Sequence, residues 1–373
     1  MRTSTERILT THTGSLPRPS SLGPSPTEEE LARAVREVVE RQRAAGVDVV
    51  NDGECGKPSY ATYVLDRLSG FGDQSPTPFL GKGRADLADF PAYRERLAGE
   101  IAGSIGVQPV CVDHVRYVGS AALVAELDRL RTATEGVGAT EVFCTAASPG
   151  VIARFMPNRF YQDETSYLQA LADAMKEEYD AIVAAGFVLQ LDCPDLTAGW
   201  DARSGDLVAH RRMVAERLEA LDSATRDIES DRLRMHLCWG NYEGPHHHDL
   251  PLADFIDLVL AARPAAVSFE AANPRHEHEW TIFEDLALPD GKILIPGVLD
   301  STTNYIEHPE LVAQRICRYA DAVGKERVLA GTDCGFATFA SSATVDPDIA
   351  WAKLAAMSEG AERASARLWG RGS

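Results

Sequence analysis

Short apolar runs rich in β-branched residues alternate along the chain with longer segments in which apolar residues recur every three or four positions. The first pattern indicates buried strands, and the second indicates helices with one apolar face. One helix has a clear start and end, because Thr27 and Glu30 form a capping box and Gly46 follows the last apolar position. The predicted strands are residues 8–15, 47–54, 141–148, 187–195, 233–241, 265–273, 293–300 and 327–335.

Helical patterns lie between most of these strands. They include residues 164–185, 204–229, 252–262 and 308–323. Near-continuous apolar strands separated by helices are typical of a parallel sheet that is covered on both faces. Eight such units favour an α/β fold in which the sheet closes into a (β/α)₈ barrel, the TIM barrel, over an open doubly wound sheet.

Residues 70–136 interrupt this alternation with a Gly/Pro-rich stretch and a polar run. Within them "PVCVDHVRYVG", residues 109–119, is predicted to form an extra hairpin. We predict that residues 1–373 form a single (β/α)₈ barrel domain. The segment of about 70–136 is then an insertion between the second and third strands of that barrel.

Polar residues follow the apolar part of the predicted strands, at the carboxyl ends. In a (β/α)₈ barrel the active site is built from these strand ends. The sequence therefore predicts a site at this rim of the barrel. Its candidate residues are His12, Ser15, Asp52, Glu54, Asp192, His236, Cys238, Glu270, Asp300, Asp333 and Cys334.

His236 and Cys238 are two positions apart in "MHLCWGN", so both side chains point to the same face of a strand. They are either ordinary core residues or half of a metal site. Zinc needs three or four ligands and prefers imidazole nitrogen and thiolate sulfur. Cys334 and Glu270 end two other strands at the same rim and would complete a tetrahedral set. The residues alone leave both interpretations open.

The chain has a formal net charge of −19 and a pI near 5.0. Nucleic acids and anionic membrane surfaces attract basic proteins, so this balance argues against both as partners. No apolar run approaches the about 18 residues of a membrane span, and the N-terminus lacks the apolar core of a signal peptide. The seven cysteines are scattered and odd in number, which argues against a disulfide framework. We expect a cytoplasmic enzyme, and the sequence leaves homo-oligomer formation open.

Six short motifs, in this order, resemble the catalytic domain of the cobalamin-independent methionine synthase family and its single-domain relatives. They are "HTGSLPRP" (12–19), "DGE" (52–54), "LQLDCPDL" (189–196), "HLC" (236–238), "SFE" (268–270) and "TDCG" (332–335). The resemblance runs along nearly the whole chain. It implies a zinc-dependent transferase that moves a methyl or alkyl group to a small thiol.

The resemblance also implies roles for particular residues. The implied zinc ligands are His236, Cys238, Glu270 and Cys334. The residues implied to hold the thiol substrate are Ser15, Glu54 and Asp192. Glu270, as the ligand that gives way to the substrate, and Asp192 are the implied catalytic residues. Two carboxylates suit an ammonium group, which favours homocysteine, and a zinc-bound thiol loses its proton and becomes a nucleophile.

Other positions depart from the pattern of the family. Thr302 stands where the synthase carries a histidine that serves as an acid, so the source of the acid stays open. The folate-stacking tryptophan aligns near Phe155, and "CPD" (193–195) replaces an acidic motif after Asp192. The donor is therefore open between a methyl-folate, a methylated corrinoid or other small donor, and an epoxide.

Two further functions compete with methyl transfer. Epoxyalkane:coenzyme M transferase belongs to the same group and opens an epoxide with a zinc-bound thiolate. Its sulfonate substrate needs cationic contacts, for which Arg18, Arg154 and Arg159 are candidates. A non-catalytic zinc- or thiol-binding barrel is the second alternative. The similar barrel of uroporphyrinogen decarboxylase uses no metal, and the ligand set argues against that class.

Three consecutive histidines in "GPHHHDL" (244–250) follow Cys238 closely. On an extended chain their side chains alternate in direction. We interpret them as lining the mouth of the site, and a second bound metal is the alternative.

Overall fold

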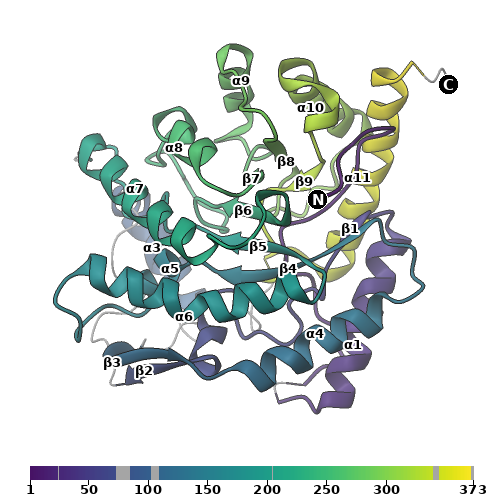
Figure 1. The fold of residues 1–373 in the computed structure, drawn as a ribbon. Coiled ribbons are helices and arrows are strands. Elements are labelled where there is room, and N and C mark those ends of the chain that lie inside the picture. The colour runs from purple at the N-terminus through teal and green to yellow at the C-terminus, as the bar shows by residue number, and fades with distance from the viewer. Residues whose placement is uncertain (24, 73–84, 102–108, 204, 339–343, 371–373) are drawn as a thin grey trace.

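The computed structural model describes residues 1–23, 25–72, 85–101, 109–203, 205–338 and 344–370. Parallel strands form its main sheet, and helices surround this sheet on the outside (Figure 1). In spatial order the strands are β1 (Val49–Val50), β4 (Glu141–Ala147), β5 (Val188–Asp192), β6 (Leu233–Leu237), β7 (Ala266–Phe269), β8 (Ile293–Leu299) and β9 (Gly331–Thr332). Because each strand is parallel to the one before it, all their carboxyl ends lie at the same rim.

Residues 9–11 close the sheet between its two edge strands. The Thr11 amide donates to the carbonyl oxygen of Ala330 at 2.8 Å, next to β9. On the other side, the Val49 amide donates to the carbonyl oxygen of Thr10 at 3.0 Å. The predicted (β/α)₈ barrel is therefore confirmed. The first predicted strand contributes a parallel bridge at Thr10 where a longer regular strand was expected.

The helices follow the predicted pattern. The Thr27 hydroxyl accepts from the Glu30 amide, and the Glu30 carboxylate accepts from the Thr27 amide, which is the predicted capping box of α1 (Glu28–Ala44). The four predicted helical segments contain α6 (Glu164–Ala184), α7 (Leu207–Ala224), α8 (Ile256–Ala261) and α10 (Pro309–Val323). Residue 204, the start of one predicted segment, lies outside the described residues. No helix in the described part of the chain is both long and apolar enough to cross a bilayer.

Several helices were not predicted individually. The further α-helices are α2 (Ala85–Asp89), α3 (Pro91–Ile101), α4 (Ser120–Thr134), α5 (Pro149–Phe155), α9 (Ile282–Asp285) and α11 (Pro347–Leu368). The 3₁₀ helices are η1 (Thr62–Asp66), η3 (Ser230–Arg232), η4 (Leu252–Asp254), η5 (Glu277–Thr281) and η6 (Lys325–Arg327). Short helices such as α5 and α9 span too few turns to show a hydrophobic period in the sequence.

A second, two-stranded sheet lies in the predicted insertion. In it β2 (Leu68–Gly72) pairs antiparallel with β3 (Val110–Tyr117). The hairpin predicted within 109–119 is therefore wrong. These residues form one strand because no glycine or proline between positions 110 and 118 permits a tight turn. Parts of the insertion, 73–84 and 102–108, lie outside the described residues, and the single-domain organisation stays a prediction.

The barrel interior changes character along its axis. Its amino half is an apolar layer formed by Leu9, Val49, Phe143, Val188, Ala266, Ile293, Ile295 and Leu329. Next to this layer the fully buried guanidinium of Arg234 lies over the Phe143 ring, 3.9 Å from its centroid. It donates to Gln190 Oε1 at 2.7 Å and to the His12 carbonyl oxygen at 2.6 Å. Such bonds offset the cost of burying a charge, so a polar floor lies beneath the carboxyl rim.

Candidate metal centre

Three metal-ligating side chains from two barrel strands meet at the carboxyl rim. His236 lies in β6, Cys238 follows that strand directly, and Cys334 lies two positions after β9. The two Sγ atoms are 3.7 Å apart, and with an imidazole nitrogen of His236 all three ligand atoms lie within 4.8 Å of one another. Two sulfurs bound tetrahedrally to one zinc ion at about 2.3 Å are about 3.8 Å apart. The sulfur spacing therefore fits a bound metal.

The His236 ring has an unsatisfied nitrogen. Its Nδ1 lies 3.4 Å from the Ser268 hydroxyl, whereas its buried Nε2 has no hydrogen-bond partner within the described residues. Burial lowers the pKa of His236 to about 3, so the ring is neutral at physiological pH. Buried polar atoms are normally satisfied, and a neutral imidazole nitrogen without a partner is suited to metal ligation.

Cys238 needs a nearby cation to become a thiolate. A hydrogen bond with Cys334, together with burial, raises the pKa of Cys238 well above its ordinary value. The Gly240 amide donates to Cys238 Sγ at 3.2 Å, which favours negative charge on that sulfur. A bound divalent cation reverses the effect of burial, because a coordinating thiol is deprotonated. The donor set thus fits a thiolate-preferring metal such as zinc.

Glu270 follows β7 and lies beside the three converging ligands. Its Oε1 accepts from the Trp239 amide at 2.7 Å, and its Oε2 accepts from Asn273 Nδ2 at 2.9 Å. Burial, followed by the neighbouring Cys238, raises the pKa of Glu270 well above its usual range. The carboxylate is not part of the group of three whose ligand atoms converge. Both of its oxygens are instead held by the loops that follow β6 and β7.

Asp333 orders the loop that carries Glu270. Its buried carboxylate accepts from the backbone amides of Ala271, Ala272 and Asn273 at 2.7 to 2.8 Å. Burial raises its pKa to about 7 despite these bonds. Asp333 precedes Cys334, so one residue connects the loop after β7 to the segment that carries a candidate metal ligand. Sequence analysis found Asp333 at the rim but assigned it no role.

The two predicted ammonium-binding carboxylates lie at the same rim. Asp192 is the last residue of β5 and lies opposite His236 in the strand register. Gln190 Nε2 donates to Asp192 Oδ1 at 2.8 Å, and Gln190 also accepts from Arg234, so Asp192 rests on the polar floor. Burial and the charge of Glu54 raise the pKa of Asp192 to about 8. Proximity of two buried carboxylates suits a cationic group between them.

Glu54 is held by a network that sequence analysis missed. Thr145 Oγ1 donates to Glu54 Oε1 at 2.7 Å, and the buried Lys57 Nζ donates to Thr145 Oγ1 at 2.9 Å. Glu54 itself has φ +56°, a left-handed conformation that turns the chain sharply after Gly53. A lysine in a loop and a threonine inside a strand give no local signal, so their joint role emerges only from the fold.

Ser15 lies against the segment that carries Cys334. The Phe336 amide donates to the Ser15 carbonyl oxygen at 2.8 Å, and the Ala337 amide lies 3.4 Å from Ser15 Oγ. A Cβ atom on Gly335 would come within 2.0 Å of Ser15 Oγ, so the close approach requires glycine there. The structure therefore brings the three predicted thiol-binding residues to the rim that holds the candidate metal ligands.

Comparison with known proteins places the chain in a family. The family model described as "Cobalamin-independent synthase, Catalytic domain" matches residues 149–362, more than half of the chain. The matched region contains His236, Cys238, Glu270 and Cys334. The chain belongs to this family. The resemblance predicted from the six motifs is thereby confirmed.

Individual relatives agree with this assignment. A methionine synthase of Thermococcus kodakarensis is 24% identical over 343 residues, which covers 90% of this chain and 84% of the relative. A methionine synthase of Saccharolobus solfataricus is 24% identical over 371 residues, covering 95% and 93%. The B12-independent methionine synthase of Shewanella sp. W3-18-1, solved in complex with selenomethionine, superposes with a TM-score of 0.77 at 18% identity and covers 98% and 99%. The last likeness supports the barrel fold.

Positions at which this family member departs from the family pattern lie near the rim. The Thr302 hydroxyl donates to Asp300 Oδ1 at 2.8 Å. His308 caps α10 by accepting from the Glu310 amide, as expected for a residue that begins a helix. Arg18 donates to the carbonyl oxygens of Glu54 and Lys57, whereas Arg154 and Arg159 are exposed. Arg18 thus contacts the turn that carries Glu54.

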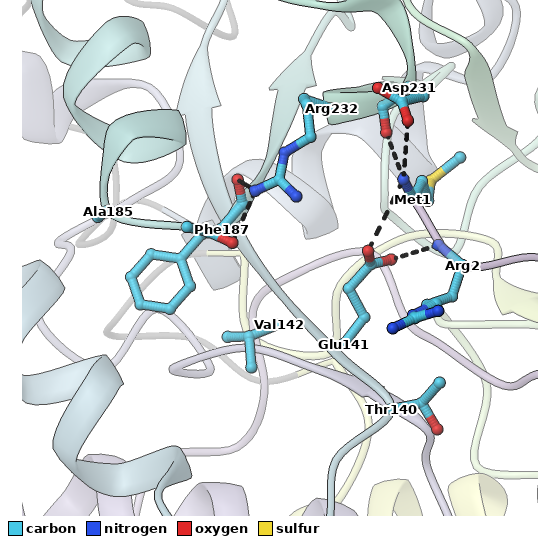
Figure 2. A pocket seen from close by; sticks show the side chains of 10 residues that line it. Met1, Arg2, Thr140, Glu141, Val142, Ala185, Phe187, Asp231 and Arg232 are labelled. Atoms are coloured by element: carbon cyan, nitrogen blue, oxygen red, sulfur yellow. Dashed lines mark hydrogen bonds and ion pairs between the residues drawn. The ribbon is translucent and has the colours of Figure 1, made fainter.

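A pocket of about 520 Å³ lies at the opposite end of the cobalamin-independent synthase barrel (Figure 2). Its residues Glu141, Phe187 and Arg232 stand at or just before the first residues of β4, β5 and β6. There the Met1 amino group lies 3.8 Å from Glu141 and 3.7 Å from Asp231. Catalytic residues of (β/α)₈ barrels lie at the carboxyl rim, so this pocket is not the candidate site.

Proposed function

We propose that the protein is a zinc-dependent transferase that moves a methyl group to a small thiol, with homocysteine as the acceptor. The observation that carries this proposal is the convergence of two cysteine sulfurs and an imidazole nitrogen of His236, a ring whose buried Nε2 has no hydrogen-bond partner among the described residues, at the carboxyl rim of a barrel from the cobalamin-independent synthase family. The two relatives described above are methionine synthases, which supports homocysteine as the acceptor.

The residues of the rim divide into two groups. His236, Cys238 and Cys334 would hold the zinc ion, and Glu270 would be the fourth ligand. Both oxygens of Glu270 already accept hydrogen bonds, which makes it the most readily exchanged of the four. A bound zinc ion keeps a coordinated thiol deprotonated at neutral pH, which supplies a nucleophilic sulfur.

The second group binds and orients the acceptor. Asp192 and Glu54 would bind its ammonium group, and Ser15 would contact the same end of the molecule. Thr145 and Lys57 fix the Glu54 carboxylate, while Gln190 fixes that of Asp192. These contacts would hold the acceptor with its sulfur toward the cysteines, and such positioning supplies a large part of catalysis in group transfer.

Zinc content and zinc-edge absorption of the purified protein test this proposal. We expect one zinc per chain at the rim, with an additional sulfur neighbour after homocysteine is added. The Cys238→Ser variant should lose this zinc. Cys193→Ser is a matched control, because Cys193 is buried at the same rim but lies outside the ligand cluster, and it should retain the zinc.

The other outcomes separate the alternatives. A sulfur neighbour gained with coenzyme M but not with homocysteine would favour epoxide opening. Zinc that is indifferent to every thiol would favour a non-catalytic barrel. Retention of the rim zinc in Cys238→Ser would overturn the ligand assignment. With homocysteine established, methionine formation from methyl-folate, methylated corrinoid or another small methyl donor identifies the donor.

A further inference from the structure

The loop after β6 meets the insertion at a second cluster of metal-ligating side chains. Asp89 ends α2 of the insertion, and His247 and His248 lie in the loop that follows Cys238. One ligand atom from each of the three lies within 4.8 Å of the others. The cluster thus joins two segments far apart in the sequence.

The two imidazoles converge on one carboxylate oxygen. His247 Nε2 lies 3.0 Å and His248 Nε2 lies 2.7 Å from Asp89 Oδ2. The other oxygen of Asp89, Oδ1, accepts from Arg203 Nη1 at 2.7 Å. Arg203 therefore orients the carboxylate and leaves Oδ2 facing the histidines.

A buried carboxylate holds the His247 ring from its far side. Asp86 Oδ1 lies 3.3 Å from His247 Nδ1 and accepts from the His248 backbone amide at 2.7 Å. A neutral His247 ring with its proton on Nε2 donates to Asp89 Oδ2, whereas a ring with its proton on Nδ1, directed at Asp86, presents an Nε2 lone pair to the same oxygen. Metal binding at this cluster uses the second form, in which the metal ion takes the place of the proton at Nε2.

The same arrangement is how proteins prepare a histidine for a metal. Metal-ligating histidines usually donate the other ring nitrogen to a carboxylate, and ligating carboxylates are themselves hydrogen-bonded. Asp86 and Arg203 supply these two supporting contacts. Two imidazole nitrogens and one carboxylate oxygen suit zinc, cobalt or nickel, in contrast to the sulfur-rich cluster at the rim.

We propose that Asp89, His247 and His248 form a second site for a divalent ion of the zinc type, which fastens α2 to the loop after β6. The site is separate from the proposed thiol chemistry. Other contacts bring the same segments together, since Phe90 packs on the His247 ring at 5.5 Å between centroids and the Tyr93 hydroxyl donates to the Glu243 carbonyl oxygen. An ion there would hold the loop that begins at Cys238 against the insertion.

Titration of metal-free, full-length protein with Co²⁺ and Zn²⁺ at pH 7.5 tests this site. Co²⁺ bound by thiolates gives intense sulfur-to-metal charge-transfer absorption, whereas Co²⁺ bound by nitrogen and oxygen gives only weak visible bands. We expect two equivalents, one of each kind. The Asp89→Asn and His248→Gln variants should lose the equivalent without sulfur absorption and retain the other.

Three further variants sharpen the result. Asp86→Asn should weaken binding at the second site by about 10–100-fold, because it removes a supporting contact. His246→Asn is the matched control, since His246 lies next in the sequence but contacts Asp249 and not the cluster. Asparagine tolerates its positive φ of +53°, so both equivalents should remain. Cys238→Ser should lose only the equivalent with sulfur absorption.

Amide hydrogen exchange supplies a second readout. Zn²⁺ should slow exchange in residues 85–89 and in the loop 241–249 of the Cys238→Ser variant, and not of the doubly substituted Cys238→Ser/His248→Gln variant. A second equivalent that survives both Asp89→Asn and His248→Gln would overturn the proposal. So would a wild-type protein that binds only the sulfur-bound equivalent, since the cluster would then be an ion pair. Failure of the rim site alone leaves this test unaffected.

Discussion

The two ends of the barrel interior are built from opposite kinds of side chain. The amino half holds apolar residues such as Phe143 and Ile295, which stabilise the barrel because their burial removes apolar surface from water. The carboxyl rim buries thiols, an imidazole and carboxylates, among them Cys238, His236 and Glu270, whose pKa values burial helps to shift. Burying such groups costs free energy. The amino half therefore stabilises the fold, whereas the buried polar groups of the carboxyl rim lower its stability and are available to bind ligands.

Removal of a rim sulfur should have the largest effect, because it should abolish metal binding without unfolding the protein. Cys334→Ser removes one of the two sulfurs that lie 3.7 Å apart, so we expect loss of the rim metal and a fall in transferase activity of more than about 100-fold, beyond what changes in supporting contacts cause. The metal-free variant should unfold within about 1 kcal/mol of the metal-free wild type. Chemical denaturation with and without Zn²⁺ measures both quantities, and Cys111→Ser is the control. A large loss of metal-free stability would show that the rim also maintains the fold.

A substitution in the apolar amino half of the barrel should have the opposite effect, lowering stability without removing the metal. Ile295→Ala leaves a cavity in the apolar layer and should lower the free energy of unfolding by about 2–5 kcal/mol. Under conditions where the variant is folded, its metal content should equal that of the wild type. Urea denaturation and metal analysis of the same sample test the pair of statements. Loss of metal from the folded variant would contradict the division between the two ends.

A smaller effect distinguishes substrate contacts from metal contacts within the rim. Asp192→Asn keeps the size of the side chain but cannot become the carboxylate that a bound ammonium group favours, so homocysteine should bind about 10–100-fold more weakly, as expected for a lost hydrogen bond between charged groups. A thiol without an ammonium group, such as 3-mercaptopropionate, should bind with unchanged or improved affinity. Isothermal titration of zinc-loaded protein with both thiols provides the comparison. Equal weakening for both would assign Asp192 to the metal centre.

The mildest test uses pH and the ring of His12. Burial lowers the pKa of His12 to about 3, and its hydrogen bond to Gln42 only partly opposes this shift. Between pH 3 and about 6.5 the unfolded chain therefore binds a proton that the folded ring does not bind. Burial of the His12 ring therefore leaves the free energy of unfolding unaffected by this proton above about pH 6.5. That free energy falls as pH decreases from about 6.5 toward 3. Histidine NMR should show a neutral ring at pH 5, and His12→Asn should show a shallower loss of stability from pH 7 to pH 5.

Much of the barrel was predictable because its strands obey strong local rules. Eight apolar runs with polar carboxyl ends specify both the parallel sheet and the rim at which His236, Cys238 and Cys334 meet. The antiparallel pairing of β2 with β3 was not predictable, since α2 and α3 lie between the two strands in the chain.

The contacts that support the site were also hidden from the sequence. Lys57 reaches Glu54 through Thr145, and Asp333 accepts three amides from another strand's loop. Such partners are set by the register of neighbouring strands and by loop conformation, neither of which has a local sequence pattern. The cluster of Asp89, His247 and His248 illustrates the same limit. The run of histidines is visible in the sequence, but Asp89 precedes His247 by 158 positions in the chain.

The contacts that close the barrel, between residues 11–13 and residues 330–332, affect the order in which the barrel can fold during synthesis. Thr13 Oγ1 donates to the Thr332 carbonyl oxygen across a separation of 319 residues, and Thr11 pairs with Ala330 beside it. During synthesis the first barrel segment must therefore wait for 319 further residues before its partner is made. Cys334 arrives with that partner, so Cys238 has no second sulfur nearby until these contacts form. Ring closure and assembly of the candidate metal centre thus depend on the same segment, the one that contains Thr332 and Cys334.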